Sequence, residues 1–253
     1  MIHRFLGPRL SRYVQWRYFS AAKLRWKLAS GVQIEILSPV DWTLYNDIFV
    51  DGEYDVAIER ALNCQKQEIS VLDLGANVGF FILRLMDRAA RMNGTKRIKV
   101  VAVEPDTKNI EELKRRVCEQ SFENLDLQIL EGVVGHREGQ AVLYKSHNYH
   151  AHTIIAGSRY SGSQPNTVRY LNLEALYPGV QWDLVKCDIE GAEGEFVESY
   201  FDLLCRTKIF VLEVHHGACE ISKLRSSLGN AGLKTEHNVV DHGTNSMHIF
   251  TRD

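Results

Sequence analysis

The sequence of 253 residues lacks several features that mark whole classes of protein. Its five cysteines are an odd number without a Cys-x-x-Cys pair, so neither a disulfide framework nor a zinc finger is expected. We expect reduced, mostly buried thiols. No run of about 18 apolar residues is present, which excludes a membrane-spanning helix. An apolar signal core is also missing, so we expect a cytoplasmic protein.

Excess charge of one sign is absent overall but present locally. The formal net charge is −2. The first 34 residues contain seven basic side chains and no acid, whereas the remainder has 23 basic and 32 acidic residues, a charge of −9. The overall balance argues against a nucleic-acid partner. The basic segment favours a cap or a contact in a homo-oligomer, and it leaves open an anionic acceptor, a targeting signal or peripheral membrane contact through residues 1–30.

The N-terminal part of the chain predicts a small helical cap, which we assign to residues 1–60. Apolar side chains at helical spacing over 3–29 predict one basic amphipathic helix or two shorter ones, ended by Gly31. Alternation over 32–37 predicts a strand, and Pro39 with Asp41 predicts a turn.

From residue 61 to 253 short apolar strands alternate with helices, which predicts one domain with a mostly parallel sheet covered on both faces. Residues 144–165, rich in His, Ser, Gly and Tyr, predict a long loop that selects the acceptor. The expected strands are 69–74, 98–103, 125–130, 183–187, 208–214, 234–240 and 247–251, and the expected helices are 55–65, 78–92, 109–119 and 221–228.

Two strand ends carry the first chemical signal. The sequence VLDLGANVG over 71–79 places glycines where a strand turns into a helix, and Glu104 ends the next strand. Such a pair binds a nucleoside, because the backbone approaches the ligand and the acid accepts hydrogen bonds from the ribose. The dinucleotide pattern Gly-x-Gly-x-x-Gly fails at Asn77. Asp73 beside the turn would repel pyrophosphate and favour an ammonium group, so S-adenosylmethionine fits better than NAD.

Three segments together resemble the FkbM family of S-adenosylmethionine-dependent methyltransferases. They are LDLGANVG (72–79), VEP (103–105) and LVKCDIEGAE (184–193), with weaker matches at 52–55 and 212–215. The resemblance covers roughly residues 45–216. It implies an α/β, Rossmann-like class I methyltransferase fold with a seven-stranded, mostly parallel sheet, an antiparallel C-terminal strand and an N-terminal helical cap.

The resemblance also implies the cofactor-binding residues. The methionine part of S-adenosylmethionine would be held by the turn, the ribose by an acid, the adenine by an apolar residue, and the methyl region would face a further acid. Asp73, Gly75, Ala76, Asn77 and Gly79 would form the turn that holds the methionine part. Glu104 would bind the ribose hydroxyls, Val133 would contact the adenine, and Asp188 would face the methyl group. Asp55 departs from the Glu that the family pattern leads us to expect after Tyr54.

A hydroxyl acceptor must lose a proton, and histidine is the natural base. His215 is the leading candidate, because Glu213 lies on the same strand face, and His152 in the predicted loop is next, together with His147 and His150. Asp188 completes the catalytic set.

The acids near the site leave alternatives open. Asp188, Glu213 and His215 could instead bind a divalent metal, but no spacing demands one and none is predicted. Glu190 and Glu193 either stabilise a helix start or orient a ligand. Cys187 alternates to the opposite face from Asp188 and is expected in the core.

The resulting prediction is an O-methyltransferase for a hydroxyl on a sugar or natural-product-like small molecule. The alternatives are methylation of nitrogen or of a macromolecule, and a non-catalytic binding module. The amine of a nucleic-acid base is disfavoured as the methyl acceptor, because the Asn/Asp-Pro-Pro-aromatic motif of nucleic-acid N-methyltransferases is replaced by DIEG at 188–191.

Overall fold

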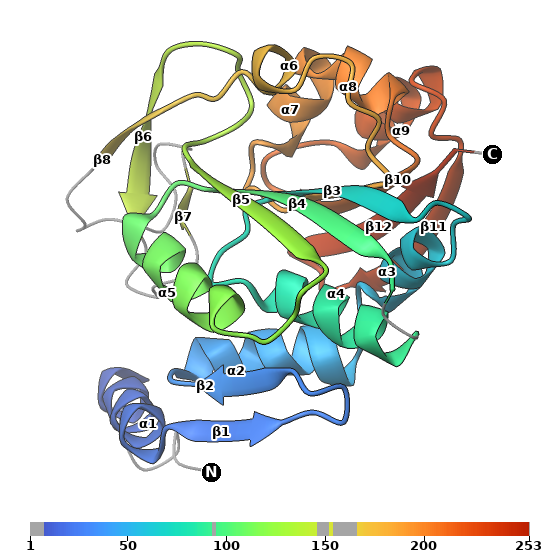
Figure 1. Ribbon diagram of the computed structural model, residues 1–253. Coiled ribbons are helices and arrows are strands. Elements are labelled where there is room, and N and C mark those ends of the chain that lie inside the picture. Colours follow the sequence, from blue (N-terminus) through green and yellow to red (C-terminus); the bar gives the residue numbers. More distant parts are fainter. Residues whose placement is uncertain (1–7, 93–94, 146–151, 154–165, 253) are drawn as a thin grey trace.

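The computed structural model describes residues 8–92, 95–145, 152–153 and 166–252, which fold around a seven-stranded sheet (Figure 1). The strand order is β11-β12-β10-β9-β3-β4-β5. In chain order the strands are β3 (Glu68–Leu74), β4 (Arg97–Glu104), β5 (Leu125–Glu131), β9 (Leu184–Cys187), β10 (Ile209–His215), β11 (Thr235–Asp241) and β12 (Asn245–Thr251). β12 runs antiparallel to β10 and β11, and all other neighbouring strands of this sheet are parallel. The predicted sheet is therefore confirmed.

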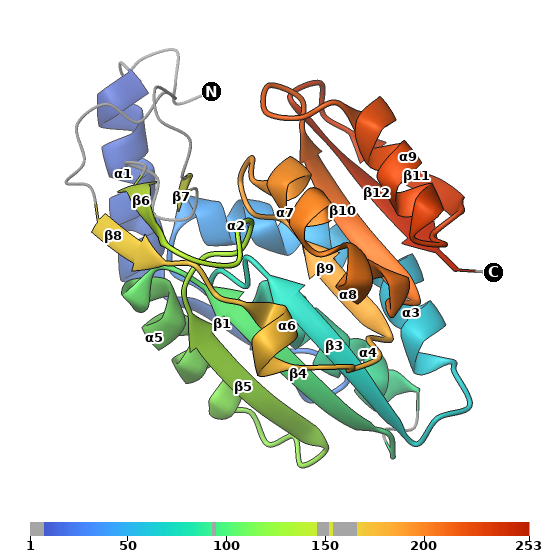
Figure 2. The same cartoon turned by 90° about the horizontal axis from the view of Figure 1, so that it is seen from above.

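Helices cover both faces of the sheet (Figures 1 and 2). One face carries α3 (Asp55–Leu62), α4 (Phe80–Arg91) and α5 (Thr107–Cys118), and the other carries α6 (Leu173–Leu176), α7 (Glu193–Ser199), α8 (Phe201–Cys205) and α9 (Ile221–Asn230). Central strands such as β9 are buried along their whole length, as expected of a parallel sheet sandwiched between helices.

Aromatic packing fixes α7 over the sheet. The ring of Phe196 stacks on Tyr200 at 4.9 Å and on Phe210 of β10 at 6.3 Å between centroids. All three side chains are fully buried. Because aromatic rings bury large areas, this stack holds α7 against β10.

The N-terminal residues form a further layer beyond α4 (Figure 1), and the predicted helix over 3–29 is only partly correct. The helix α1 spans Pro8–Ala22, and residues 24–27 form a strand, β1 (Leu24–Lys27), paired with β2 (Gln33–Ile36). Lys23 has a φ of +43°, which breaks the helix, and Trp26 packs edge-to-face on Tyr45 at 4.9 Å. Gly31, with a φ of +95°, lies in the hairpin turn instead of ending a helix.

The predicted turn at Pro39 is wrong, because a helix, α2 (Pro39–Tyr45), begins there. The Ser38 hydroxyl accepts a hydrogen bond from the Asp41 amide at 3.0 Å, and proline suits the first helical turn. A short π-helix, η2 (Asn46–Val50), extends α2. The turn then passes through Gly52, whose φ is +68°, into α3.

A three-stranded sheet that the sequence did not predict lies at the edge where β4 and β5 end (Figure 1). Its order is β7-β6-β8, from β6 (Gln140–Lys145), β7 (His152–Thr153) and β8 (Asn166–Arg169). The range predicted as a loop, 144–165, therefore includes the end of β6 and the whole of β7. Its segments 146–151 and 154–165 lie outside the described residues.

A buried ion pair ties the N-terminal layer to α5. The Arg116 guanidinium donates to an Asp41 carboxylate oxygen at 2.8 Å and to the Glu35 carbonyl at 3.0 Å. The Arg116 and Asp41 side chains are 4% and 2% exposed. Removing one partner would leave an uncompensated buried charge, which typically costs about 3–5 kcal/mol.

All five cysteines are free thiols, but the expectation that most are buried is wrong. Only Cys187 is buried, as predicted for that residue. Cys118 and Cys205 are exposed, because each ends a helix on its solvent side. Within the described ranges no helix is both long and apolar enough to span a membrane.

Candidate active site

The candidate site lies at the carboxyl edge of the sheet, between β3 and β9 (Figure 2). After β3 the chain builds outward through β4 and β5, and it then returns to place β9 and β10 on the other side of β3. Ligands of open α/β sheets bind at such a reversal of strand order. The strand ends that meet there carry most of the residues predicted from the sequence.

The turn after β3 needs its first glycine. Gly75 has a φ of +75°, and a Cβ at this position would lie 1.8 Å from the carbonyl oxygen of Asp188. No side chain fits between two backbones at that distance, so only glycine lets the turn meet the end of β9. Asn77 has a φ of +50°, a left-handed conformation that Asn tolerates better than most residues. Gly79, at +91°, leads into α4.

Hydrogen bonds from neighbouring residues hold Glu104 at the end of β4. One carboxylate oxygen accepts from the Asn77 amide at 2.9 Å, and the other accepts from the Asp106 amide at 3.0 Å and the Asn109 side chain at 3.1 Å. Glu104 is only 4% exposed. Its carboxylate is thus fixed beside the glycine turn before any ligand binds, which is the preorganisation that a ribose site requires.

A cleft of about 590 Å³, partly open to solvent, runs along these strand ends. Its described lining includes three carboxylates and no Lys or Arg. The lining residues are Gly75, Asn77, Val103, Glu104, Pro105, Asn109, Gly132, Val133, Val134, Leu143, Asp188, Ile189, Glu190 and Ala192.

Of the predicted cofactor residues, Gly75, Asn77, Glu104, Val133 and Asp188 line the cleft. Asp73, Ala76 and Gly79 lie behind it. Ala76 is buried, and the position of Gly79 lets α5 pack closely, since a Cβ there would lie 3.0 Å from the Val117 side chain. These three residues therefore shape the turn from behind the surface of the cleft.

Lys186, in the middle of β9, is a site residue that the sequence reasoning missed. Its ammonium lies 3.2 Å from Asp73 Oδ1 and 3.7 Å from Asp188 Oδ2, and it donates to the Gly75 carbonyl at 2.7 Å. Burial disfavours its charge, but Asp73 and Asp188 outweigh burial and raise the pKa of Lys186. The sequence feature that could have identified it is a single lysine within the apolar run Leu184–Cys187.

Asp73 on β3 is the ion-pair partner of Lys186. Its side chain is completely buried, and burial, with a smaller effect of Asp188, raises the pKa of Asp73 while Lys186 opposes the shift. The aspartate therefore acts on the cleft through Lys186, which joins it to the turn at Gly75 and to Asp188.

His215 at the end of β10 is held between two glutamates. Its Nδ1 lies 2.9 Å from Glu193 Oε1, and its Nε2 lies 3.4 Å from Glu190 Oε2. Glu193 is completely buried and also accepts from the Gly191 amide at 2.9 Å. Glu190 has a φ of +54° and lines the cleft. Non-glycine residues in this conformation often mark functional sites.

Neighbouring charges shift the pKa values of His215 and Glu190. Burial lowers the pKa of His215, but Glu193, Asp188 and Glu190 outweigh it and raise the pKa to about 10. Burial and Asp188 raise the pKa of Glu190 to about 7, although His215 opposes the shift. At neutral pH the ring of His215 therefore holds a proton before cofactor or substrate binds. A protonated ring cannot accept a second proton, so in this state His215, the leading candidate for the base, cannot act by itself.

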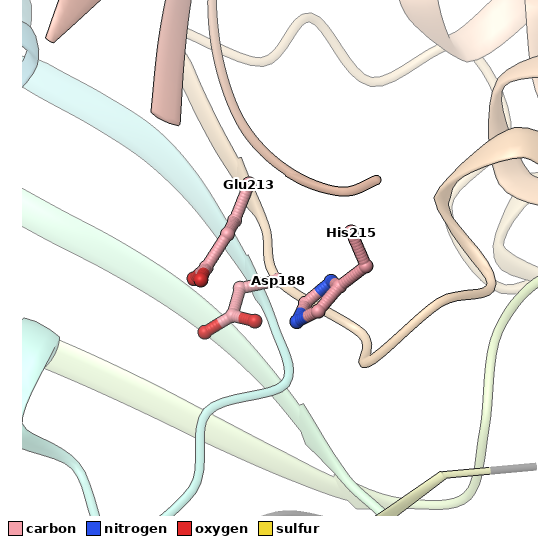
Figure 3. A group of neighbouring side chains, drawn as sticks. All are labelled: Asp188, Glu213 and His215. Carbon is pink, nitrogen blue, oxygen red and sulfur yellow. The ribbon is translucent and has the colours of Figure 1, made fainter. Parts of the chain in front are cut away.

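Asp188, Glu213 and His215 come together at the ends of β9 and β10, and their side chains converge in Figure 3. One ligand atom from each lies within 4.8 Å of the others. Asn245 donates a hydrogen bond to Glu213, and burial with Asp188 raises the pKa of Glu213 well above its ordinary value. The geometry is compatible with the divalent-metal alternative.

The other predicted histidines are less informative. His216, the neighbour of His215 in the chain, bonds through its ring to Ser246 Oγ at 2.9 Å and to the Gly243 carbonyl at 3.2 Å. His152 lies in β7, with its side chain undescribed, and His147 and His150 lie outside the described residues.

Comparison with known proteins gives consistent results. Residues 73–236 match the family described as Methyltransferase FkbM domain. A protein of Jannaschia sp. (strain CCS1), named "Putative methyltransferase", is 30% identical over 148 residues, which are 54% of this chain and 52% of that protein. The chain thus spans about half the length of this relative. The methyltransferase FkbM structure from Methylobacillus flagellatus KT has a TM-score of 0.51 and 12% identity, covering 96% of this chain and 60% of that chain. The predicted class I methyltransferase fold is confirmed.

Proposed function

Because the chain belongs to the family of FkbM methyltransferase domains, we propose that it transfers a methyl group from S-adenosylmethionine to a hydroxyl of a sugar or similar polyhydroxylated small molecule. The observation that carries the choice of cofactor is the charge of the cleft. Glu104, Asp188 and Glu190 line it, and no basic side chain is among its described lining residues. Carboxylates attract a sulfonium and an ammonium group and repel the phosphates of NAD.

The cleft residues fit the parts of S-adenosylmethionine. Glu104 accepts hydrogen bonds from the ribose hydroxyls, and Val133 with Leu143 contacts the adenine. Asp188 and Glu190 face the positively charged methionine end. Asp73 holds Lys186, which in turn holds the turn and Asp188 in position.

When bound, S-adenosylmethionine supplies a methyl group on a sulfonium that is already a good leaving group. The main task of the protein is to align the acceptor oxygen with that methyl, since positioning can lower a barrier by about 7–11 kcal/mol. We assign this task to Asp188 and to residues 144–165, including His152.

The acceptor proton passes to the pair formed by His215 and Glu190. Their ring nitrogen and carboxylate lie 3.4 Å apart, so they titrate together. Glu190, whose pKa is raised to about 7, takes up the proton near neutral pH. Glu193 fixes the ring through Nδ1.

A divalent cation on Asp188, Glu213 and His215 is a second arrangement, favoured by their 4.8 Å spacing. These groups would hold the ion, which would supply a positive charge to an acceptor oxygen. Turnover that survives extensive chelation supports the metal-free assignment, whereas loss restored by one added cation supports the metal.

The test incubates the whole chain with methyl-labelled S-adenosylmethionine and pooled sugars, glycosides, amines, RNA and protein. We expect label in a hydroxylated small molecule, and much less with Asp188→Asn. A matched variant, Glu131→Gln, changes a strand-end acid outside the cleft lining and should retain turnover. Label in an amine or a macromolecule would contradict the acceptor class, and no transfer despite cofactor binding would support a binding module.

The five free thiols support a cytoplasmic location.

A further inference from the structure

The helix α1 exposes a face that mixes apolar and basic side chains. Val14 and Tyr18 are four residues apart, and Arg17 lies between them, so all three share one face of the helix. Val14 is 39% exposed and Tyr18 is 63% exposed. Phe19 contacts Trp42 of α2 with ring centroids 6.4 Å apart, which is how α1 meets the rest of the protein. The Val14–Tyr18 face is therefore left to solvent.

Exposed aromatic side chains are concentrated here. In the part of the chain that the structure describes, four aromatic side chains are exposed, and Trp16, Tyr18 and Trp42 belong to α1 and α2. The fourth is Phe201 on α8. Trp and Tyr favour a membrane–water interface, because each combines an apolar ring with a polar group.

The charge distribution indicates what kind of surface this face meets. The first 34 residues contain seven basic side chains and no acid, and the rest of the chain carries −9. An anionic surface would attract this end and repel the remainder, which fixes the orientation. A second copy docked through the same face would oppose like charges. Nucleic acid would leave Val14 and Tyr18 without an apolar partner.

We propose that α1 and the adjoining β1–β2 hairpin form a docking surface for an anionic lipid membrane. Val14 and Tyr18 enter the interface, and Arg17 and Lys27, both exposed, meet the acidic headgroups. The proposal is independent of the methyl-transfer reaction, since none of these residues is among the described residues that line the cleft.

The experiment is co-sedimentation of the whole chain with vesicles of phosphatidylcholine mixed with phosphatidylglycerol, and with vesicles of phosphatidylcholine alone. We expect binding to the mixed vesicles only, falling with added salt. Arg17→Gln should weaken the partition constant about fivefold, because one basic side chain near an anionic surface contributes about 1 kcal/mol. Tyr18→Ala should also weaken it.

Matched control variants distinguish binding through this surface from non-specific binding to vesicles. Phe201→Ala removes an aromatic side chain that is 41% exposed, and Arg97→Gln removes an exposed cation on β4. Neither change should alter the partition constant. Far-UV circular dichroism confirms that each variant folds. The proposal is overturned by absent binding, by equal losses in the controls, by preference for RNA over the mixed vesicles, or by a lipid-free dimer that Tyr18→Ala dissociates.

Discussion

Replacing Glu104 by Gln tests the ribose assignment with the smallest change of shape. The carboxylate now uses one oxygen toward the Asn77 amide and the other toward Asp106 and Asn109. Gln keeps one acceptor oxygen and replaces the other by a donor, so the ribose loses a bond to a charged acceptor. Such a bond contributes about 1.5–3 kcal/mol, and we expect the Kd for S-adenosylmethionine to rise about 10- to 100-fold.

Calorimetric titration measures this Kd, and a urea melt measures stability separately. The melt is needed because an amide group facing the Asn77 N–H leaves a buried donor unpaired, which costs about 1–3 kcal/mol. Glu131→Gln is the control, since Glu131 pairs with Glu104 in the sheet register but lies outside the described cleft lining. A folded Glu104→Gln protein whose Kd stays within about twofold of wild type would refute the assignment.

Four further outcomes follow from the geometry. Lys186→Met should lower the unfolding free energy by about 3–5 kcal/mol, because Asp73 and Asp188 lose a buried counter-charge, and adding Asp73→Asn should restore part of it; a urea melt equal to wild type would contradict this. Wild type should lose stability as pH rises from about 6.5 to about 10, since His215 binds its proton more tightly when folded, and His215→Asn should flatten that slope in pH-dependent melts. Turnover should rise with pH toward about 7 as Glu190 loses its proton, and an unchanged profile for Glu190→Gln would remove Glu190 from the proton path. Gly75→Ala should abolish cofactor binding and strongly destabilise the fold, because its Cβ would meet the Asp188 carbonyl at 1.8 Å; normal binding by calorimetry would show that the turn adapts.

Local sequence patterns predicted the sheet and the cleft because both depend on strand ends. Buried parallel strands are short apolar runs, and their carboxyl ends must meet at one edge. Chain order placed Gly75 and Glu104 together, the family resemblance added Asp188, and the structure brings all three to one cleft.

The failures arose where long-range contacts decide the local structure. Leu24 and Leu28 fit a helical spacing, yet Trp26 packs on Tyr45 from a strand. The β6–β8 sheet depends on antiparallel partners more than 20 residues apart, which no local pattern reveals. Pro39 suits a turn and a first helical turn equally, and the Ser38 cap decided between them.

The proton chemistry could not be predicted for a related reason. His215 looked like a base because of its strand position, but its pKa depends on Glu193 and Glu190, which approach it from another segment. Lys186 was missed because its importance comes from Asp73 on the neighbouring strand.

The most direct test of the central claim is the melting temperature of the whole chain with S-adenosylmethionine and with NAD. A ligand that binds the folded state at about 100 times its Kd adds about 2.7 kcal/mol of stability. We predict that S-adenosylmethionine raises the melting temperature and that NAD leaves it unchanged. A flat response to S-adenosylmethionine, or an equal rise with NAD, would contradict the assignment of the cleft.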